Sequence, residues 1–456
     1  MTRRPVIKHR IVYAIFCIPF IFAFLTWVYL PPVAEWLVAN LFRYKGAQQP
    51  NIYWYFTVRV FFSWYTFLAI GVAGAWVIAA AFSRKKHVEA KHSFYPFVSF
   101  VVPAYNQQEN VSGCVRSLLE CAHDYDGMCE IIVVDDGSTD GTYEKALLVL
   151  GSVPKDNCYV RGKVVRHMSN LGKIEALKTG VNKSLGNIIA IVDADSQWDP
   201  LTLKKLVDYK LSNGKKAVTG YVDPSAEKPN AYVALQKLEY SQGLGVGRCA
   251  QSLFDNVLVV SGAIGIYEAD LLRGILFEKN IRSVTEDLEI TLEMHRKGAK
   301  VGYNNQTATS TVVPTSFSAL WKQRTRWFTG WLHNTMDIYE PLSHKRSWLM
   351  MLLWYTYIFE FVGAFIDLAA LIAFPILFWF APNRISFLLN LVVLTLYGLL
   401  VGLMFQAIAL KYAYGKSADY KLLLYVPIYP LLWLLNVLAR TKSFASYLEG
   451  NNGKWH

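Results

Sequence analysis

The chain has 456 residues, which is enough for two or three structural units. Hydrophobic residues make up 53% of it and charged residues only 18%, whereas a soluble domain carries about 25% charged residues. This composition excludes a disordered chain and an ordinary soluble enzyme, and it predicts a membrane protein. The net charge of +12 favours anionic lipid headgroups or phosphate-bearing ligands as partners over a nucleic-acid polymer.

Two uncharged apolar stretches near the N-terminus, residues 11–30 and 60–82, are each long enough to cross a bilayer. Because basic residues precede the first stretch, a signal peptide is the alternative to a membrane anchor. However, the stretch exceeds the apolar part of a signal peptide, and no small-residue cleavage site precedes Pro31 and Pro32. We therefore expect residues 1–95 to form a membrane region with two transmembrane helices.

Hydrophobicity returns in three stretches near the C-terminus: residues 348–381, 385–410 and 422–439. They predict a C-terminal membrane region over residues 348–456 with two or three spans. Pro427 and Pro430 interrupt the last stretch, so a re-entrant segment is the alternative to a full crossing. Glu360 and Asp367 are seven residues apart, which would place them on one face of a regular helix as candidate lining groups.

The basic residues beside the first two predicted spans set the expected orientation. Four of them precede the first span and three follow the second: Arg3, Arg4, Lys8, Arg10, Arg84, Lys85 and Lys86. Positively charged flanks favour the cytosolic side of a membrane. We therefore expect an integral protein of the plasma membrane whose central region lies in the cytosol.

In the central region, residues 96–314, short apolar runs alternate with segments of helical period. The predicted strands are residues 97–102, 130–134, 187–192, 216–222 and 257–267, and the predicted helices are residues 110–121, 142–150 and 173–185. Continuous apolar runs indicate strands covered on both faces. The alternation predicts an α/β domain with a mainly parallel sheet, in which ligands bind at the carboxyl ends of the strands.

Polar side chains follow the first two predicted strands. Tyr105 follows the first, and the second ends in Asp135 and Asp136 before a Gly-Ser turn. A carboxylate at this place can accept hydrogen bonds from a base or ribose edge. The alternative is an Asx turn that caps the next helix.

Asp193 and Asp195 follow the third predicted strand. Where a strand ends and bends, both carboxylates can approach one cation, and Mg²⁺ or Mn²⁺ suits carboxylate and phosphate ligands. An EF-hand is excluded because the twelfth position from Asp193 is Lys204. Lys173 opens the helix before this strand, where it could hold phosphate oxygens; a solvated lysine is the alternative.

Two further motifs lie near the end of the central region: Thr285-Glu286-Asp287 and Gln323-Arg324-Thr325-Arg326-Trp327. A carboxylate near an acceptor hydroxyl can act as a general base, and an Arg beside an aromatic ring can hold phosphate and stack on a sugar. The alternative for the first motif is a helix start that Thr285 caps. Residues 315–347 predict amphipathic helices at the membrane interface, with packing onto the spans as the alternative.

The acidic pair, the DxD, TED and QxxRW motifs, in this order, resemble a family-2 inverting glycosyltransferase. The likeness is to the membrane-embedded branch that includes hyaluronan, chitin and cellulose synthases, and it covers about residues 97–335. It implies a GT-A fold, which is Rossmann-like, inserted between N- and C-terminal transmembrane helices. Residues 260–267 also resemble the segment beside the acceptor in hyaluronan synthases, without the cysteine or aromatic residue common there.

The resemblance implies donor-binding roles for several matched residues. Tyr105 would stack on uracil and Asp135 would hydrogen-bond its edge. Lys173 and Asp193 would hold the nucleotide and the donor sugar. Two residues of the last motif would steady the departing diphosphate: Gln323 and Arg326.

The remaining matched residues would carry the chemistry and the acceptor. Asp287 would be the catalytic base with Glu286 beside it, and Asp195 would coordinate Mg²⁺ or Mn²⁺. Trp327 and Gly262 would lie against the acceptor.

The sequence therefore predicts a metal-dependent enzyme that transfers a hexosyl unit from a UDP-sugar to a membrane-associated acceptor, with inversion. A lipid-linked glycan or glycolipid and a growing polysaccharide are equally favoured acceptors. One alternative is a dolichyl-phosphate-type sugar transferase, a branch not expected to carry QxxRW. The other is a nucleotide-sensing transporter or flippase, which need not keep both the TED and QxxRW motifs.

Overall fold

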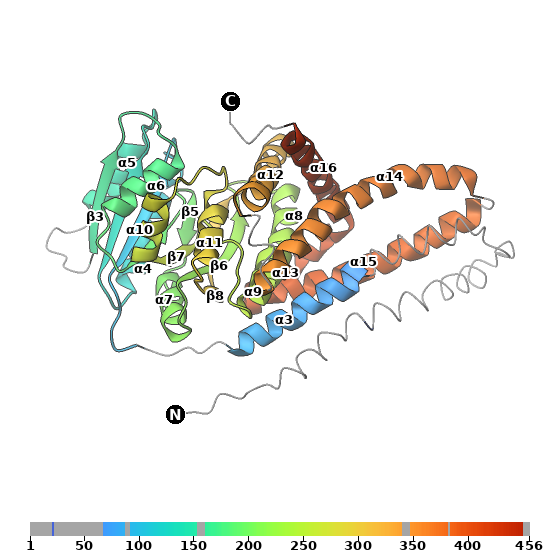
Figure 1. The fold of residues 1–456 in the computed structure, drawn as a ribbon, viewed down its shortest axis with the longest axis horizontal. Coiled ribbons are helices and arrows are strands. Elements are labelled where there is room, and N and C mark those ends of the chain that lie inside the picture. Colours follow the sequence, from blue (N-terminus) through green and yellow to red (C-terminus); the bar gives the residue numbers. More distant parts are fainter. Residues whose placement is uncertain are drawn as a thin grey trace.

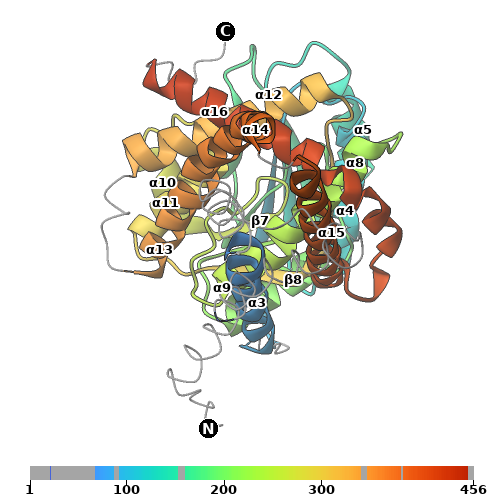
Figure 2. The same cartoon turned by 90° about the vertical axis from the view of Figure 1, so that its right-hand side faces the viewer.

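The computed structural model describes residues 21, 67–86, 92–152, 160–339, 347–381 and 384–449. An α/β domain lies at one end, and apolar helices extend away from one side of it (Figures 1 and 2). Apart from Ile21, the first predicted transmembrane segment lies outside the described residues, and the second is described only from Phe67 onward.

An eight-stranded sheet forms the centre of the α/β domain, in the order β3-β2-β1-β4-β7-β6-β8-β5. The strands are β1 (Val98–Ala104), β2 (Cys129–Asp135), β3 (Val160–Arg166), β4 (Ile188–Ile191), β5 (Ser196–Trp198), β6 (Ala217–Ser225), β7 (Gly265–Glu268) and β8 (Val301–Val312). β1 pairs in parallel with β2 and β4, and β2 pairs in parallel with β3. Every residue of β1 and β2 is buried, because helices cover both faces of this part of the sheet.

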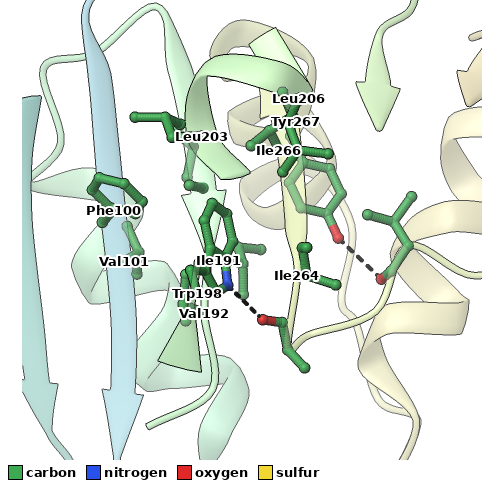
Figure 3. Packing of buried hydrophobic residues seen from close by; sticks show 14 of the residues in the cluster. Phe100, Val101, Ile191, Val192, Trp198, Leu203, Leu206, Ile264, Ile266 and Tyr267 are labelled. Atoms are coloured by element: carbon green, nitrogen blue, oxygen red, sulfur yellow. Dashed lines mark hydrogen bonds between the residues drawn. The ribbon is translucent and has the colours of Figure 1, made fainter. Parts of the chain in front are cut away.

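The three predicted helices of this half are confirmed with small shifts at their ends. They are α4 (Val111–His123), α5 (Thr142–Gly151) and α6 (Lys173–Asn182), and α7 (Thr202–Ser212) follows β5. In the core, the rings of Phe100 and Trp198 pack edge to face with centroids 5.6 Å apart. Trp198 Nε1 donates to the Ala263 carbonyl at 2.9 Å, which ties β5 to the loop before β7 (Figure 3).

The α/β prediction is confirmed, but the sheet is mixed where a mainly parallel sheet was expected. β7 runs antiparallel to β4 and β6, and β5 runs antiparallel to β8, whereas β6 and β8 are parallel. The antiparallel pairing arises after β6, because the chain then turns back and β7 lies between β4 and β6.

The strand predicted over residues 257–267 is wrong for most of its length, since β7 covers only its last residues. Val257, Val260 and Ile264 are fully buried, so the apolar pattern of a buried loop imitates that of a strand. The backbone groups of this loop bond to partners outside a ladder. Val260 N donates to Thr291 Oγ1 at 3.0 Å, and the Gly262 carbonyl accepts from Asp193 N at 2.9 Å.

Seven further helices connect the sheet to the apolar helices. They are α8 (Ala231–Tyr240), the π-helix η3 (Ser241–Arg248), α9 (Cys249–Ser252), α10 (Ala269–Glu278), α11 (Glu286–Arg296), α12 (Phe317–Leu332) and the π-helix η4 (His333–Ile338). Asn230 caps α8 by accepting from two backbone N–H groups, and Ser316 caps α12. Both caps fix where the helices that flank the site begin.

Three helical stretches of the described chain are long and apolar enough to cross a membrane: Trp348–Phe380, Phe387–Ser417 and Tyr420–Leu448. The first stretch consists of α13 (Trp348–Tyr355), the π-helix η6 (Thr356–Val362) and α14 (Gly363–Phe380). The second consists of α15 (Arg384–Tyr414) and the 3₁₀ turn η7 (Gly415–Ser417). The third consists of the 3₁₀ helix η8 (Tyr420–Ile428) and α16 (Tyr429–Leu448). On the N-terminal side, η2 (Phe67–Val72) and α3 (Ala73–Lys86) lie along α15, where Ile70 packs against Val401 (Figure 1). These helices indicate membrane association.

The interpretation of Glu360 and Asp367 as one polar lining is not supported. The π-helix η6 contains Glu360, and its wider turn breaks the regular seven-residue spacing. Glu360 instead forms an ion pair with Arg440 of α16, and Asp367 is buried. A charged pair between two apolar helices holds them together, because neither group can be left alone in lipid.

Candidate functional site

The carboxyl ends of β1 and β2 place Tyr105 and Asp135 side by side at one edge of the sheet. Ala104, the last residue of β1, is in register with Asp135, the last residue of β2. The Asp135 carboxylate is fully buried, and it lies 3.1 Å from Arg166 Nε and accepts from Ser138 N at 3.3 Å. The Tyr105 side chain is exposed, so its ring is free to cover a planar ligand.

Asp136, which has no separate role in the sequence analysis, fixes the backbone turn before Lys173. Its Oδ1 accepts from Leu171 N at 3.0 Å and lies 2.7 Å from His167 Nδ1, while Oδ2 accepts from Gly172 N at 2.8 Å. Gly172 has φ +94°, a conformation that favours glycine. Asp136 therefore shapes the turn that delivers Lys173 to the site, and the signal for it was the second acid of the pair.

Lys173, at the start of α6, joins two of the predicted acidic residues. Its Nζ lies 2.7 Å from Asp193 Oδ1 and 2.6 Å from Glu286 Oε1. Burial lowers the pKa of Lys173, but the two carboxylates outweigh burial and raise it well above its ordinary value. The lysine therefore stays charged and holds together two acidic residues, Asp193 and Glu286, that are 93 positions apart in the sequence.

Gly262 closes one side of this ion-pair cluster. A Cβ at this position would lie 2.9 Å from Asp193 Oδ2 and 3.2 Å from Lys173 Nζ. A larger residue here would make the ends of the Asp193 and Lys173 side chains shift, so glycine keeps the cluster in its present arrangement.

Asp195 and Asp287 are the two carboxyls of the site with an increased proton affinity. Burial, and then repulsion from Asp193, raises the pKa of Asp195 to about 6. Burial, and then repulsion from Glu286, raises the pKa of Asp287 to about 6. Asp195 Oδ1 faces the Ser196 and Thr311 hydroxyls at 3.3 Å each, and Asp287 Oδ1 accepts from Leu288 N at 2.8 Å. Each carboxylate keeps lone pairs for a cation or a proton.

Thr285 occupies the residue before α11, as the capping alternative expected, but its side chain does not cap that helix. Its Oγ1 accepts instead from Asn334 Nδ2 at 2.9 Å, and Asn334 also donates to Ser283 Oγ at 2.8 Å. A Cβ at Gly330 of α12 would lie 2.3 Å from Thr285 Oγ1. The helix that carries QxxRW is therefore packed directly onto the start of the TED motif.

In the QxxRW helix, Arg324 rather than Arg326 is fixed by the protein. Arg324 is buried, pairs with Glu239 of α8, and lies 4.5 Å from the centroid of the Trp327 ring. Glu239 also accepts from Asn436 of α16 at 2.7 Å. Arg326 is exposed, so its guanidinium remains available to a ligand.

Gln323 and Trp327 are the first and last residues of the motif. Gln323 Oε1 is buried and has no hydrogen-bond partner within the described part of the chain. Trp327 packs over Tyr240 of α8 with ring centroids 6.3 Å apart. The Trp327 side chain therefore lies at the junction of α8 and α12.

Two family profiles match the chain. The one described as "Glycosyl transferase family 2" matches residues 99–276, and the one described as "Glycosyl transferase family group 2" matches residues 188–439, more than half of the chain. The protein belongs to the family 2 glycosyltransferases. The acidic pair, the DxD, TED and QxxRW motifs all fall inside these matches.

This glycosyltransferase is related to polysaccharide synthases. It is 26% identical over 276 residues to the poly-beta-1,6-N-acetyl-D-glucosamine synthase of Staphylococcus epidermidis, covering 60% of this chain and 64% of the relative. It is 24% identical over 260 residues to the synthase of the same name from Staphylococcus aureus, covering 56% and 60%. The match therefore spans less than two thirds of each relative.

One solved structure shares the fold over most of the chain. The mannosyltransferase PcManGT of Pyrobaculum calidifontis, solved with GDP-Man and Mn²⁺, aligns with a TM-score of 0.52 and 18% identity, over 84% of this chain and 96% of that one. The predicted GT-A fold is thus confirmed for the glycosyltransferase domain, with three apolar helices following it.

Proposed function

We propose that this glycosyltransferase transfers a hexosyl unit from a UDP-sugar to a membrane-associated glycan acceptor, with inversion at the anomeric carbon. The observation that carries the proposal is the convergence of Lys173, Asp193 and Glu286 beside Asp287. Lys173 Nζ lies within 3 Å of both Asp193 and Glu286. The TED motif therefore lies at the end of the sheet where the nucleotide would bind. Because relatives of this chain in staphylococci are named poly-beta-1,6-N-acetyl-D-glucosamine synthases, UDP-N-acetylglucosamine is the first donor to test.

The donor would lie across the carboxyl ends of the strands. The exposed Tyr105 ring would stack on uracil, while Asp135, held by Arg166, would accept from the edge of the base. Lys173 and Asp193 would hold the nucleotide and the sugar. Arg326 and Gln323 would meet the departing diphosphate from α12.

The reaction would be a single displacement. Asp287 would take the proton of the acceptor hydroxyl, whose oxygen bonds to the anomeric carbon as the bond from that carbon to the diphosphate oxygen breaks. A pKa raised to about 6 makes Asp287 a stronger base than an ordinary aspartate and still leaves it ionised at neutral pH. Glu286 and Lys173 would keep the base in place beside the acceptor.

A divalent cation fits the donor set at Asp195. The raised pKa of this carboxyl and its proximity to Asp193 favour binding of a positive charge. The described residues contain no group of three or more His, Cys, Asp or Glu side chains gathered around one ion, so the diphosphate would supply most of the ligands, as suits Mg²⁺ or Mn²⁺. When bound, the cation offsets the charge of the departing UDP.

The test is UDP release by the purified protein in lipid nanodiscs with Mn²⁺ and a panel of UDP-sugars, GDP-mannose included. Release that depends on Mn²⁺ and falls in Asp287→Asn supports the proposal, whereas no release from any donor refutes it. Sizing a radiolabelled product then separates the acceptors: a high-mass ladder indicates a polysaccharide, and a short organic-extractable product indicates a glycolipid. Nucleotide binding without any turnover would instead support the transporter alternative.

A further inference from the structure

A chain of hydrogen bonds joins Asp136 to helix α6 through His167 and Thr179. His167 Nδ1 lies 2.7 Å from Asp136 Oδ1, and His167 Nε2 lies 2.9 Å from Thr179 Oγ1. The Asp136 and His167 side chains are only 3% and 10% exposed. The backbone N–H group of His167 also donates to the Asp135 carbonyl at 2.9 Å. The imidazole is therefore held at its backbone and at both of its ring nitrogens.

The chemistry of these groups determines the direction of the first hydrogen bond. A carboxylate only accepts, so His167 Nδ1 carries a proton and donates to Asp136. Nε2 faces the Thr179 hydroxyl, which can serve as donor or as acceptor. The two nitrogens of one ring thus make two different contacts, and each contact can be removed separately.

The two ends of this chain of hydrogen bonds hold α6 at different places. Asp136 holds the start of the helix, because its carboxylate accepts from Leu171 N at 3.0 Å and from Gly172 N at 2.8 Å. Thr179 lies in the second turn of the same helix. Movement of α6 along or about its axis would break one of these contacts. His167 therefore ties the helix to the residue that follows β2.

The position of α6 matters because Lys173 is its first residue. Lys173 Nζ contacts two carboxylates at once, Asp193 at 2.7 Å and Glu286 at 2.6 Å. Hydrogen bonds weaken steeply with distance and angle, so a displaced α6 would cost the lysine at least one of these contacts. Gly262 leaves little room beside the ammonium, since a Cβ there would lie 3.2 Å from Nζ.

We propose that His167 is a positioning residue of the donor site, which holds Asp136 and α6 so that Lys173 meets Asp193 and Glu286 together. The inference rests on the proposed function, in which Lys173 holds the nucleotide and the donor sugar. It deepens that function by naming a residue outside the motifs that sets donor affinity. His167 acts through Asp136 and the turn before Lys173, and not by contact with the ligand.

The experiment replaces one ring nitrogen of His167 at a time, in the full-length protein in nanodiscs. In His167→Asn the amide N–H takes the place of Nδ1–H and can still donate to Asp136. The longer side chain of His167→Gln places its amide near Thr179 and leaves Asp136 without this donor. The measurement is UDP affinity by titration calorimetry with Mn²⁺. His123→Gln is the matched control, because this imidazole at the end of α4 is 88% exposed.

We expect His167→Gln to raise the Kd for UDP at least about tenfold, because a hydrogen bond to a charged group is lost. His167→Asn and His123→Gln should stay within about threefold of the wild type. Asp136→Asn should also weaken UDP binding, and the double variant Asp136→Asn/His167→Gln should bind no more weakly than the weaker of the two single variants. Non-additivity is expected because both substitutions break the same link.

A purely structural role of His167 predicts a different pattern. Loss of stability alone would lower Tm while the folded protein bound UDP normally, so the titrations are made well below the Tm of every variant. An unchanged Kd in His167→Gln overturns the inference, and so does an equal loss in His167→Asn or an additive loss in the double variant. If His167→Gln does not fold, an unchanged Kd in Asp136→Asn overturns it. Absence of UDP release by the wild type with every donor would refute the proposed function instead, whatever the variants bind.

Discussion

Replacing Asp287 with asparagine is the most direct test of the proposed chemistry. The amide has the size of the carboxylate, and its oxygen can still accept from Leu288 N, the bond now 2.8 Å long. The ion pairs of Lys173 with Asp193 and Glu286 do not involve Asp287. The substitution therefore removes the base while it leaves the donor-binding cluster intact.

The expected loss follows from the role of a general base. Such a base contributes about 10²–10⁴-fold to the rate, which corresponds to about 3–5 kcal/mol of activation free energy. We expect kcat for UDP release to fall by at least the lower bound, and Kd for UDP with Mn²⁺ to change by less than about twofold.

The assay is UDP release at saturating donor and acceptor, paired with UDP titration calorimetry. Glu278→Gln is the control, because this acid of α10 is exposed and makes the same change of carboxylate to amide far from the ion-pair cluster. Turnover of Asp287→Asn within about threefold of the wild type would remove Asp287 as the base. An equal loss in the control would show a general effect of charge.

The raised pKa also gives the variant a pH signature. Because the base must be ionised, wild-type kcat should rise with pH through about 6 and level off above it, and Asp287→Asn should lose this limb. Saturating Mn²⁺ keeps Asp195 ionised, so the limb then reports Asp287. A carboxyl whose pKa is higher in the folded than in the unfolded state destabilises the fold as the pH rises between these two pKa values. Asp287→Asn removes this effect, so without metal the variant should melt at a higher temperature than the metal-free wild type at neutral pH.

Three further substitutions test other parts of the site. Asp195→Ala should weaken UDP binding at least about tenfold in Mn²⁺ and have little effect in EDTA, since its carboxylate is the proposed metal ligand; equal Kd values in Mn²⁺ would reject that assignment. Lys173→Met should abolish measurable UDP-sugar binding, because Asp193 and Glu286 would face each other without a cation; retained affinity would make the lysine merely structural. Gly330→Ala should reduce kcat while leaving UDP affinity unchanged, because the new Cβ would force α12 away from Thr285. Gly398→Ala is the control, because a Cβ there meets no atom within 4 Å. Equal activity of the two variants would show that the contact between α12 and Thr285 does not affect catalysis.

The sequence contained enough information to predict which side chains gather at one end of the sheet. Strands β1 and β2 are uninterrupted apolar runs, and the strand-end rule placed Tyr105 and Asp135 at the same end of the sheet. The family resemblance implied that Lys173 and Asp193 belong to one site, and their side chains lie 2.7 Å apart. The strand-end placement agrees with the structure because it depends on local pattern and on the parallel part of the sheet. The roles of these residues in donor binding stay a proposal.

The loop before β7 and the contacts of α12 could not be predicted in the same way. The loop before β7 has the apolar pattern of a strand, and its true conformation depends on side-chain partners such as Thr291. Strands β3 and β8 were missed because their sequences are rich in charged or polar residues. Likewise, only tertiary contacts reveal that Arg324 is bound by Glu239.

Glu239 has a consequence for how the enzyme depends on its surroundings. This one carboxylate bonds to Arg324 of α12 and to Asn436 of α16, and α12 in turn rests on the TED turn through Gly330. We expect a change in the position of α16, caused by detergent or by a bilayer of another thickness, to reach the TED turn before it reaches the sheet where we propose that the nucleotide binds. Under the proposed function, solubilised protein should therefore lose turnover before it loses affinity for UDP.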